Sequence, residues 1–143
     1  TAVHSGTYNS NPVSMAGTLA ALRHLSRNGG EALKRAHARG RKLMDGLAQL
    51  GRELDQPLTV RGAPTVFHVS FVPEGAGPIT DFRSFRQTDG ETGRRFWQAL
   101  QARGIHVTSL GIWFVSTVHT EADIDATLAA AEQALKAVRE GNL

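Results

Sequence analysis

The stretch TVFHVSFV, residues 65–72, decides the fold of this chain because its side chains alternate between two faces. One face carries Phe67, Val69 and Phe71, and the other carries Val66, His68 and Ser70. A period of two is typical of a β-strand with one buried face. The same period begins at Leu58-Thr59-Val60, directly after Gln56-Pro57, and predicts a short strand upstream.

The segment downstream of this strand predicts a loop, a helix and two more strands. Residues 73–90 are rich in glycine and proline, so we expect a loop that Phe82 and Phe85 hold in place. We expect a helix over about 91–103 that ends at Gly104, with an inward face of Phe96, Trp97 and Leu100. Residues 105–107 and 112–118 are rich in apolar and β-branched side chains, which predicts two strands.

The last element predicted is a helix that begins after Thr120. This threonine is a helix cap, and Asp123 gives a weaker form of the capping box. The buried stripe of this helix is Ile124, Leu128, Ala131, Leu135 and Val138. From about residue 56 the chain therefore predicts an α+β layer, with helices on one face of a mostly antiparallel sheet.

Two helices are predicted before the sheet. Asn11-Pro12 is typical of a helix start, with Asn11 as the cap, and Asn28-Gly29-Gly30 ends that helix. A second helix begins near Glu31 and carries Gly40 on its apolar stripe, where a glycine permits close packing or a bend. The rest of that stripe is Leu33, Ala36, Leu43, Met44, Leu47, Leu50 and Leu54.

Composition narrows the classes of function. The 143 residues contain no cysteine, which excludes disulfides and thiolate catalysis and is compatible with a cytoplasmic protein. No apolar run approaches the roughly 18 to 20 residues of a membrane-spanning helix. The six histidines never pair at metal-ligand spacing, so we predict no metal site. The net charge is +3, but no nucleic-acid-binding motif accompanies it. A solvent-exposed basic helix face therefore explains the charge better than nucleic-acid binding does.

One segment carries a chemical argument, namely Gly6-Thr7-Tyr8-Asn9-Ser10-Asn11-Pro12. A loop that contains glycine and opens a helix offers backbone N–H groups to an anion, and the helix dipole favours a negative charge there. Thr7 adds a hydroxyl donor, and Gly6 lets the backbone approach a ligand. A phosphate is the natural guest, although on the local pattern alone ordinary turn and cap chemistry is the better explanation.

The order of several motifs resembles the class III aminotransferases, which are pyridoxal-phosphate (PLP) enzymes. Residues 6–16, GTYNSNPVSMA, are similar to the "GT…NP…A" segment of that family, and Arg103–Val107 is similar to its "RG-apolar" strand entry. Residues 114–125, FVSTVHTEADID, closely resemble the "FVSTAHTEEDID" stretch of the glutamate-1-semialdehyde aminomutases within it. The matches run in order along nearly the whole chain.

The resemblance implies a fragment of an α/β PLP-dependent transferase of fold type I. Residues 1–27 would end the large cofactor domain, 28–55 would form a connecting helix, and 56–143 would form the small C-terminal α+β domain. Gly6 and Thr7 match the residues that bind the PLP phosphate of the opposite subunit, which implies a homodimer. The implied substrate is an amino acid or an amino aldehyde, and the enzyme would be cytoplasmic. No nucleic-acid or membrane partner is implied.

Two features separate the chain from a complete member of that family. The family's Schiff-base lysine lies upstream of the Gly-Thr segment, whereas Lys34, Lys42 and Lys136 lie downstream in no matching motif. We therefore assign no catalytic residue and expect the chain to be inactive alone. In addition, Gly111 stands where the aminomutases usually carry a glutamate, so both an aminomutase and a transaminase remain open.

A rival from another class is a free-standing, non-catalytic α+β domain for binding or dimerisation. His68 is expected to face outward or bond locally, and His119 to be a structural residue before the last helix rather than part of an active site. Trp97 is expected in the core. Trp113 stays open, because it lies next to the position at which the family lines its substrate entrance.

Overall fold

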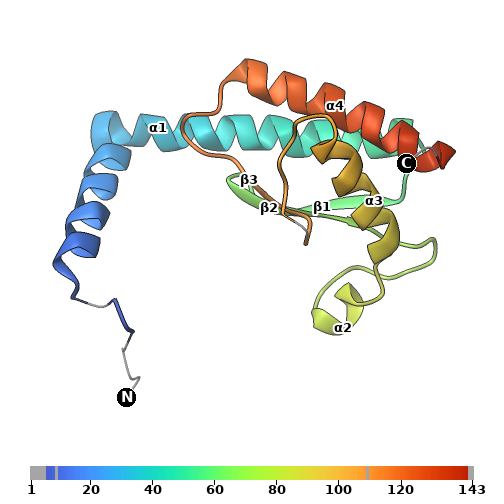
Figure 1. Cartoon of the computed structure of the whole chain (residues 1–143), viewed down its shortest axis with the longest axis horizontal. Helices are drawn as coiled ribbons and strands as arrows, with labels where there is room; N and C mark the ends of the chain where they lie inside the picture. The colour runs from blue at the N-terminus through green and yellow to red at the C-terminus, as the bar shows by residue number, and fades with distance from the viewer. Residues whose placement is uncertain (1–5, 9, 109, 142–143) are drawn as a thin grey trace. The chain divides into compact units, whose positions relative to one another are not determined.

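The computed structural model of the chain describes residues 6–8, 10–108 and 110–141. The chain divides into two compact units, Thr1–Arg35 and Ala36–Leu143. The boundary falls inside the segment 28–55 that the sequence assigns to a connecting helix. Helix α1 (Pro12–Glu53) contributes to both units, and the ribbon in Figure 1 follows the chain through them.

The first unit is helical from Pro12 onward. The side chain of Asn11 caps the helix, because its Oδ1 accepts hydrogen bonds from the backbone N–H groups of Val13 (3.0 Å) and Ser14 (3.1 Å). The helical geometry is interrupted from Arg27 to Gly30, where Asn28 takes a left-handed φ of 52°. The predicted start at Pro12 and the predicted break at Asn28-Gly29-Gly30 are both confirmed.

The second unit is built on a three-stranded antiparallel sheet of order β1-β2-β3. The strands are β1 (Leu58–Ala63), β2 (Val66–Phe71) and β3 (Ile112–Phe114). Val60 pairs with Val69, and Phe67 pairs with Trp113. The face predicted from TVFHVSFV is the buried one, formed by Phe67, Val69 and Phe71, each at most 2% exposed.

The strands predicted over 105–107 and 112–118 are wrong in extent. Residues 105–107 are not a strand, because the Ile105 N–H bonds back to the Leu100 carbonyl and closes the preceding helix. Strand β3 stops at Phe114. Beyond it, the N–H of Ser116 donates to Nδ1 of His119 instead of to a neighbouring strand. In both places backbone groups find local partners, which removes the need for a ladder.

Three helices accompany the sheet, namely α2 (Phe82–Phe85), α3 (Gly90–Gln101) and α4 (Glu121–Glu140). Helix α3 contacts both α4 and β2. The core between these elements and the second part of α1 includes Leu43, Leu47, Phe96, Leu100, Ile124 and Leu135. The prediction that Phe82 holds the loop down is wrong, because its side chain is 72% exposed. Phe85 packs edge-on against the His68 ring instead, at 5.3 Å.

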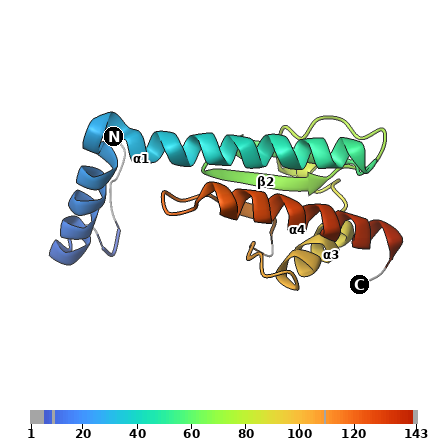
Figure 2. The same ribbon diagram turned by 90° about the horizontal axis from the view of Figure 1, so that it is seen from above.

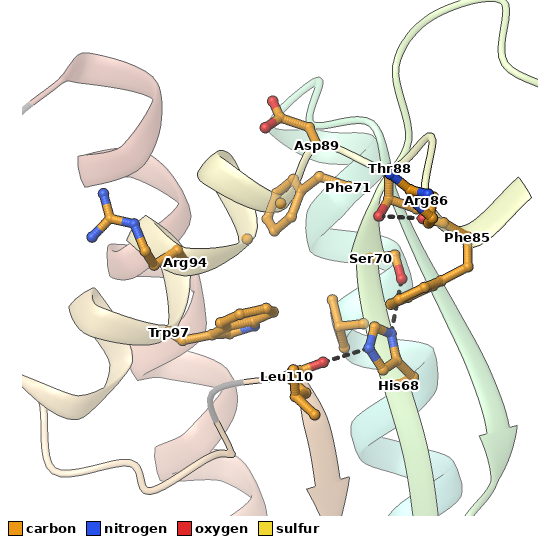
Figure 3. Close-up of a pocket in the computed structure, with 13 residues that line it drawn as sticks. His68, Ser70, Phe71, Phe85, Arg86, Thr88, Asp89, Arg94, Trp97 and Leu110 are labelled. Carbon is orange, nitrogen blue, oxygen red and sulfur yellow. Dashed lines mark hydrogen bonds between the residues drawn. The ribbon is translucent and has the colours of Figure 1, made fainter. Parts of the chain in front are cut away.

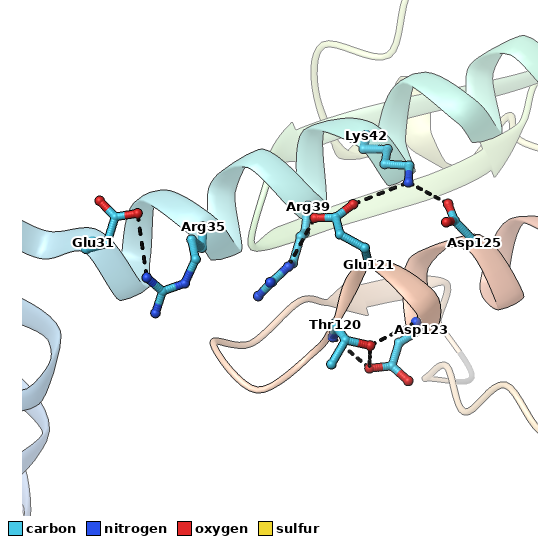
Figure 4. A network of polar contacts seen from close by, with 8 residues as sticks. All are labelled: Glu31, Arg35, Arg39, Lys42, Thr120, Glu121, Asp123 and Asp125. Carbon is cyan, nitrogen blue, oxygen red and sulfur yellow. Dashed lines mark hydrogen bonds and ion pairs between the residues drawn. The ribbon is translucent and has the colours of Figure 1, made fainter.

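Helices α1 and α4 lie side by side within this unit and run in the same direction (Figure 2). Near the start of α4, Arg39 and Lys42 both contact Glu121 at 3.2 Å, and Lys42 also contacts Asp125 (Figure 4). One turn further along, a Cβ on Gly46 would lie 2.6 Å from the Leu128 side chain. Gly46 on α1 therefore allows α4 to approach closely.

The predicted role of Gly40 is confirmed. A Cβ on this residue would lie 1.8 Å from the carbonyl oxygen of Pro64, in the turn between β1 and β2. Any side chain there would push α1 off the sheet. The predicted cap of α4 is confirmed as well, since the Thr120 hydroxyl accepts from the Asp123 N–H and the Asp123 carboxylate accepts from the Thr120 N–H.

Within the described part of the chain, no helix is long and apolar enough to cross a membrane.

Candidate functional site

The loop from Gly6 to Asn11 holds the two residues predicted to bind a cofactor. Gly6 and Thr7 are both exposed, and the turn closes through a 3.1 Å hydrogen bond from the Asn11 N–H to the Tyr8 carbonyl. Ser10 takes a left-handed φ of 66°. Within the described part of the chain, the Thr7 side chain makes no hydrogen bond, so its hydroxyl is free to donate to a ligand.

The start of α1 is less open to an anion than the sequence suggests. Pro12 has no N–H, and the N–H groups of Val13 and Ser14 both donate to Asn11 Oδ1. The N–H of Met15 donates to the Asn11 carbonyl. These bonds satisfy the first turn, so an anion bound here would rely on Thr7 and on the backbone around Gly6. An exposed hydroxyl beside a glycine backbone fits a phosphate group.

A second feature, which the sequence did not reveal, is a cavity of about 380 Å³ in the second unit (Figure 3). It lies between β2, the α2 segment and α3. Its walls include Phe71, Phe85, Trp97 and Leu110, and its polar groups include His68, Ser70 and Thr88. The alternation along β2 and the inward Trp97 were both visible in the sequence. Only the fold brings residue 68, residue 97 and residue 110 around one space.

Hydrogen bonds fix the floor of this cavity. Ser70 Oγ lies 2.8 Å from His68 Nδ1, and His68 Nε2 lies close to the Leu110 carbonyl. A carbonyl can only accept, so Nε2 carries a hydrogen; in the neutral ring Nδ1 then accepts from the Ser70 hydroxyl. The prediction that His68 bonds locally is confirmed. Trp97 is half-buried, and its Nε1 is enclosed without a hydrogen-bond partner among the described residues.

Gly111 closes one side of this region. Its φ of 74° is left-handed, and a Cβ would lie 2.6 Å from Trp97 Cζ2 and 2.9 Å from the Val69 carbonyl oxygen. A side chain at this position would therefore need both a strained backbone and a displaced Trp97. The indole ring occupies the space that the Cβ of a glutamate at position 111 would need.

The remaining candidates have structural roles. Nδ1 of His119 accepts from the Ser116 N–H at 3.0 Å, as expected of a histidine that precedes a helix. Trp113 is buried and stacks on Phe67 at 5.7 Å, so it belongs to the core. Hydrogen bonds to Asp125 and Glu121 raise the pKa of Lys42 (Figure 4). Its ammonium therefore stays protonated at neutral pH, the opposite of what an amine nucleophile requires.

Comparison with known proteins places these features in context. No family model matches the chain. Glutamate-1-semialdehyde 2,1-aminomutase of Desulfatibacillum aliphaticivorans is 33% identical over 135 residues, which cover 92% of this chain and 30% of the relative. An omega-transaminase from Sphaerobacter thermophilus superposes with a TM-score of 0.76 at 27% identity, over 96% of this chain and 31% of that protein.

A solved transaminase with PLP bound gives a TM-score of 0.77 at 26% identity, over 99% of this chain and 31% of that structure. The chain thus spans about 30% of the length of the relatives it matches. The likeness in sequence and the likeness in fold both run along nearly all of its residues. The chain corresponds to the C-terminal portion of the class III PLP-dependent aminotransferases and is close in sequence to the glutamate-1-semialdehyde 2,1-aminomutases.

Proposed function

We propose that this chain is the C-terminal part of a PLP-dependent aminotransferase or aminomutase that acts on an amino acid or an amino aldehyde. The observation that carries the proposal is the 33% identity to an aminomutase over 92% of the chain. A solved transaminase of similar fold has PLP bound. In this proposal residues 1–27 complete the cofactor domain, 28–55 connect the domains, and 56–143 form the small domain. The enzyme would be a cytoplasmic homodimer.

Gly6 and Thr7 would hold the phosphate of the cofactor. The free Thr7 hydroxyl would donate one hydrogen bond to a phosphate oxygen, and the glycine would let the backbone approach it. When bound, PLP supplies an electron sink for cleavage of bonds at the substrate's α-carbon. The resemblance to the family suggests that the phosphate belongs to the opposite subunit, so the loop would link cofactor binding to dimerisation.

The lysine that binds PLP would come from the rest of the enzyme. The lysines of this chain are Lys34, Lys42 and Lys136. Lys42 is held by Glu121 and Asp125, and Lys136 pairs with Glu132. Lys34 is exposed on α1 in solvent. A Schiff-base lysine needs a neutral amine in an enclosed site, which none of these positions offers.

The environment of Gly111 supports a transaminase over a strict aminomutase. The aminomutases usually carry a glutamate at the matching position. Here Trp97 fills the space that the Cβ of that glutamate would need, and the backbone is left-handed. A carboxylate cannot be restored at this position without moving the indole. We therefore favour transfer of an amino group between two substrates.

The test is to replace Thr7 with alanine in the complete enzyme and to measure PLP dissociation together with subunit mass. Loss of one hydrogen bond to a charged group costs roughly 1.5 to 3 kcal/mol, which weakens PLP binding about ten- to a hundred-fold. Asn11 rather than Thr7 caps α1, so the fold should survive. If the phosphate lies across the interface, cofactor loss and dimer dissociation should occur together.

Thr18→Ala is the matched control, because its hydroxyl bonds only to the Ser14 carbonyl within the helix. We expect PLP affinity to stay unchanged in this variant. Unchanged affinity in Thr7→Ala with an intact dimer would contradict the role of Thr7. A complete polypeptide without any PLP-reactive lysine would favour the non-catalytic binding domain instead.

A further inference from the structure

We propose that the cavity between β2, the α2 segment and α3 binds a small molecule with an apolar, preferably aromatic, body and one carboxylate. The proposal rests on residues of the second unit alone. It does not depend on the proposed cofactor site, and it adds a ligand site that the family resemblance does not assign.

The size and walls of the cavity select the body of the ligand. A volume of about 380 Å³ suits a molecule of roughly ten to fifteen non-hydrogen atoms, at the small end of the pockets that bind metabolites. Phe85 and Trp97 stand on opposite sides of it, and Leu110, which is 67% exposed, lies below them (Figure 3). Two aromatic walls around an open space favour a flat apolar group that can contact both rings.

The charged residues of the cavity indicate which polar group the ligand carries. Three charged residues line the cavity, namely Arg86, Asp89 and Arg94. Arg94 directs its guanidinium away from the cavity and pairs with Glu91 (Figure 3). The Asp89 carboxylate also turns outward, where it accepts from the Thr92 N–H and hydroxyl as the cap of α3. Both charged groups are therefore paired with residues outside the cavity.

Arg86 is the exception. Within the described ranges its guanidinium forms no ion pair, although it lines the cavity beside Thr88 and Phe85. A guanidinium recognises a carboxylate with two parallel hydrogen bonds, so an anionic head group is the partner it fits. Arg61, in a neighbouring cavity that shares His68, Ser70 and Phe85, also has no ion pair among the described residues. Asp81 lines that neighbouring cavity too, and its carboxylate accepts from the N–H and the hydroxyl of Ser84.

The floor of the cavity is organised before a ligand arrives. The bonds from Ser70 to His68 and from His68 to Leu110 fix the imidazole ring and join strand β2 to the loop before β3. Ser70 is 6% exposed, and when its hydroxyl donates to Nδ1 of His68 its oxygen can still accept a further hydrogen bond. A site that is already ordered loses little entropy on binding.

The experiment is a titration of the ¹⁵N-labelled 143-residue chain with 3-phenylpropionate, followed by backbone and indole NMR signals. We expect saturable binding, with shifts confined to residues that line the cavity. The neutral analogue 3-phenylpropan-1-ol keeps the ring and removes the carboxylate. It should bind about tenfold or more weakly, the effect of losing a charge-assisted contact.

Arg86→Gln should weaken binding of 3-phenylpropionate to the level of the alcohol and leave the alcohol itself unaffected. Arg83→Gln is the matched control, because Arg83 lies on the same short α2 segment but does not line the cavity. Both positions are exposed, and unchanged spectra of the free variants will verify the fold. Equal binding of acid and alcohol, an effect of Arg83→Gln equal to that of Arg86→Gln, shifts that map to α1, or no binding would each overturn the proposal.

Discussion

The two units of this chain use similar helical patterns and reach opposite degrees of burial. In the first unit, the helix carries Met15, Leu19 and Leu22 at helical spacing, yet Leu22 is 60% exposed. In the second unit, the continuation of α1 carries Leu43 and Leu47 at the same kind of spacing, and Leu47 is fully buried. Periodicity alone therefore predicts which face of a helix is apolar, but not whether this chain provides the surface that covers it.

This difference has an energetic consequence. Burial of a leucine side chain contributes about 1.5–3 kcal/mol, and the second unit gains this contribution at many positions. The helical stretch of residues 12–26 gains little of it, since every residue there except Leu25 is exposed. Isolated helices of about 12–15 residues are marginal in water. The chain spans about 30% of the length of its relatives, so most of their residues are not present here to cover this helix.

The largest expected effect is a contrast in amide hydrogen exchange between the units. Amides in the core of the second unit, such as those of Val69 and Leu135, should exchange only on global unfolding, which costs roughly 5–15 kcal/mol. Amides of residues 12–26 should exchange through local fraying, at least about a thousandfold faster. Exchange on the isolated chain, read by mass spectrometry, measures both. Uniformly slow exchange across the two units would break the comparison and indicate a self-sufficient domain.

A glycine-to-alanine pair on α1 gives the next largest effect and should change sign between the units. Gly40→Ala places a Cβ 1.8 Å from the Pro64 oxygen. Overpacking of this kind typically costs about 1–3 kcal/mol, and we expect the upper end or more, because a backbone atom is struck. Gly17→Ala meets nothing within 4 Å and should gain up to about 1 kcal/mol of helix propensity.

Urea unfolding followed by circular dichroism measures the effect of Gly40→Ala, and the helical signal of residues 12–26 reports Gly17→Ala. A neutral Gly40→Ala would mean that α1 is not seated against the turn between β1 and β2. A destabilising Gly17→Ala would mean that the first helix is packed against something.

Features that depend on residues close together in the sequence could be predicted, and features that depend on distant residues could not. Local signals were sufficient for the cap at Asn11 and for the capping box of Thr120 and Asp123, because partners two or three residues apart satisfy them. The break at Asn28 was also visible locally, because asparagine and glycine tolerate the left-handed backbone found there. The buried face of β2 also followed from its alternation. The prediction of a strand over 105–107 was wrong, because the Ile105 N–H bonds to the Leu100 carbonyl instead of to a neighbouring strand. The amino-acid composition of this segment does not reveal that bond.

The candidate sites divide in the same way. Gly6 and Thr7 were proposed because one short segment resembles the phosphate-binding loop of a known family, and they remain a prediction. The cavity was missed, because its residues come from four places between 68 and 110. Asp89 and Arg94 bond to Thr92 and Glu91, three residues away, but nothing local in the sequence says that Arg86 lines the cavity without an ion-pair partner among the described residues. Phe82 is a false prediction of the same origin. An aromatic residue in a loop suggested a buried anchor, but its side chain is exposed.

The smallest expected effect concerns acid, and it should belong to the second unit. The first unit contains one acidic residue, Glu31. In the second unit, hydrogen bonds from the N–H and the hydroxyl of Thr120 lower the pKa of Asp123 below its ordinary 3.8. A carboxyl whose pKa is lower in the folded state binds its proton more readily when unfolded. Its contribution is therefore complete above about pH 4 and is lost as the pH falls through the folded-state pKa.

Asp123→Asn keeps an oxygen that can accept from Thr120 and removes the titration. We expect the variant to start less stable at pH 7 and to show a flatter loss of stability between about pH 4 and pH 2 than the unaltered chain. Asp45→Asn is the matched control, because Asp45 lies exposed on α1 and makes no hydrogen bond or ion pair among the described residues. Urea midpoints at several pH values measure both. The caps Asp81 and Asp89 also have lowered pKa values, so part of the acid sensitivity should remain in Asp123→Asn. Identical pH profiles for Asp123→Asn and the unaltered chain would mean that the capping box at the start of α4 does not hold in solution.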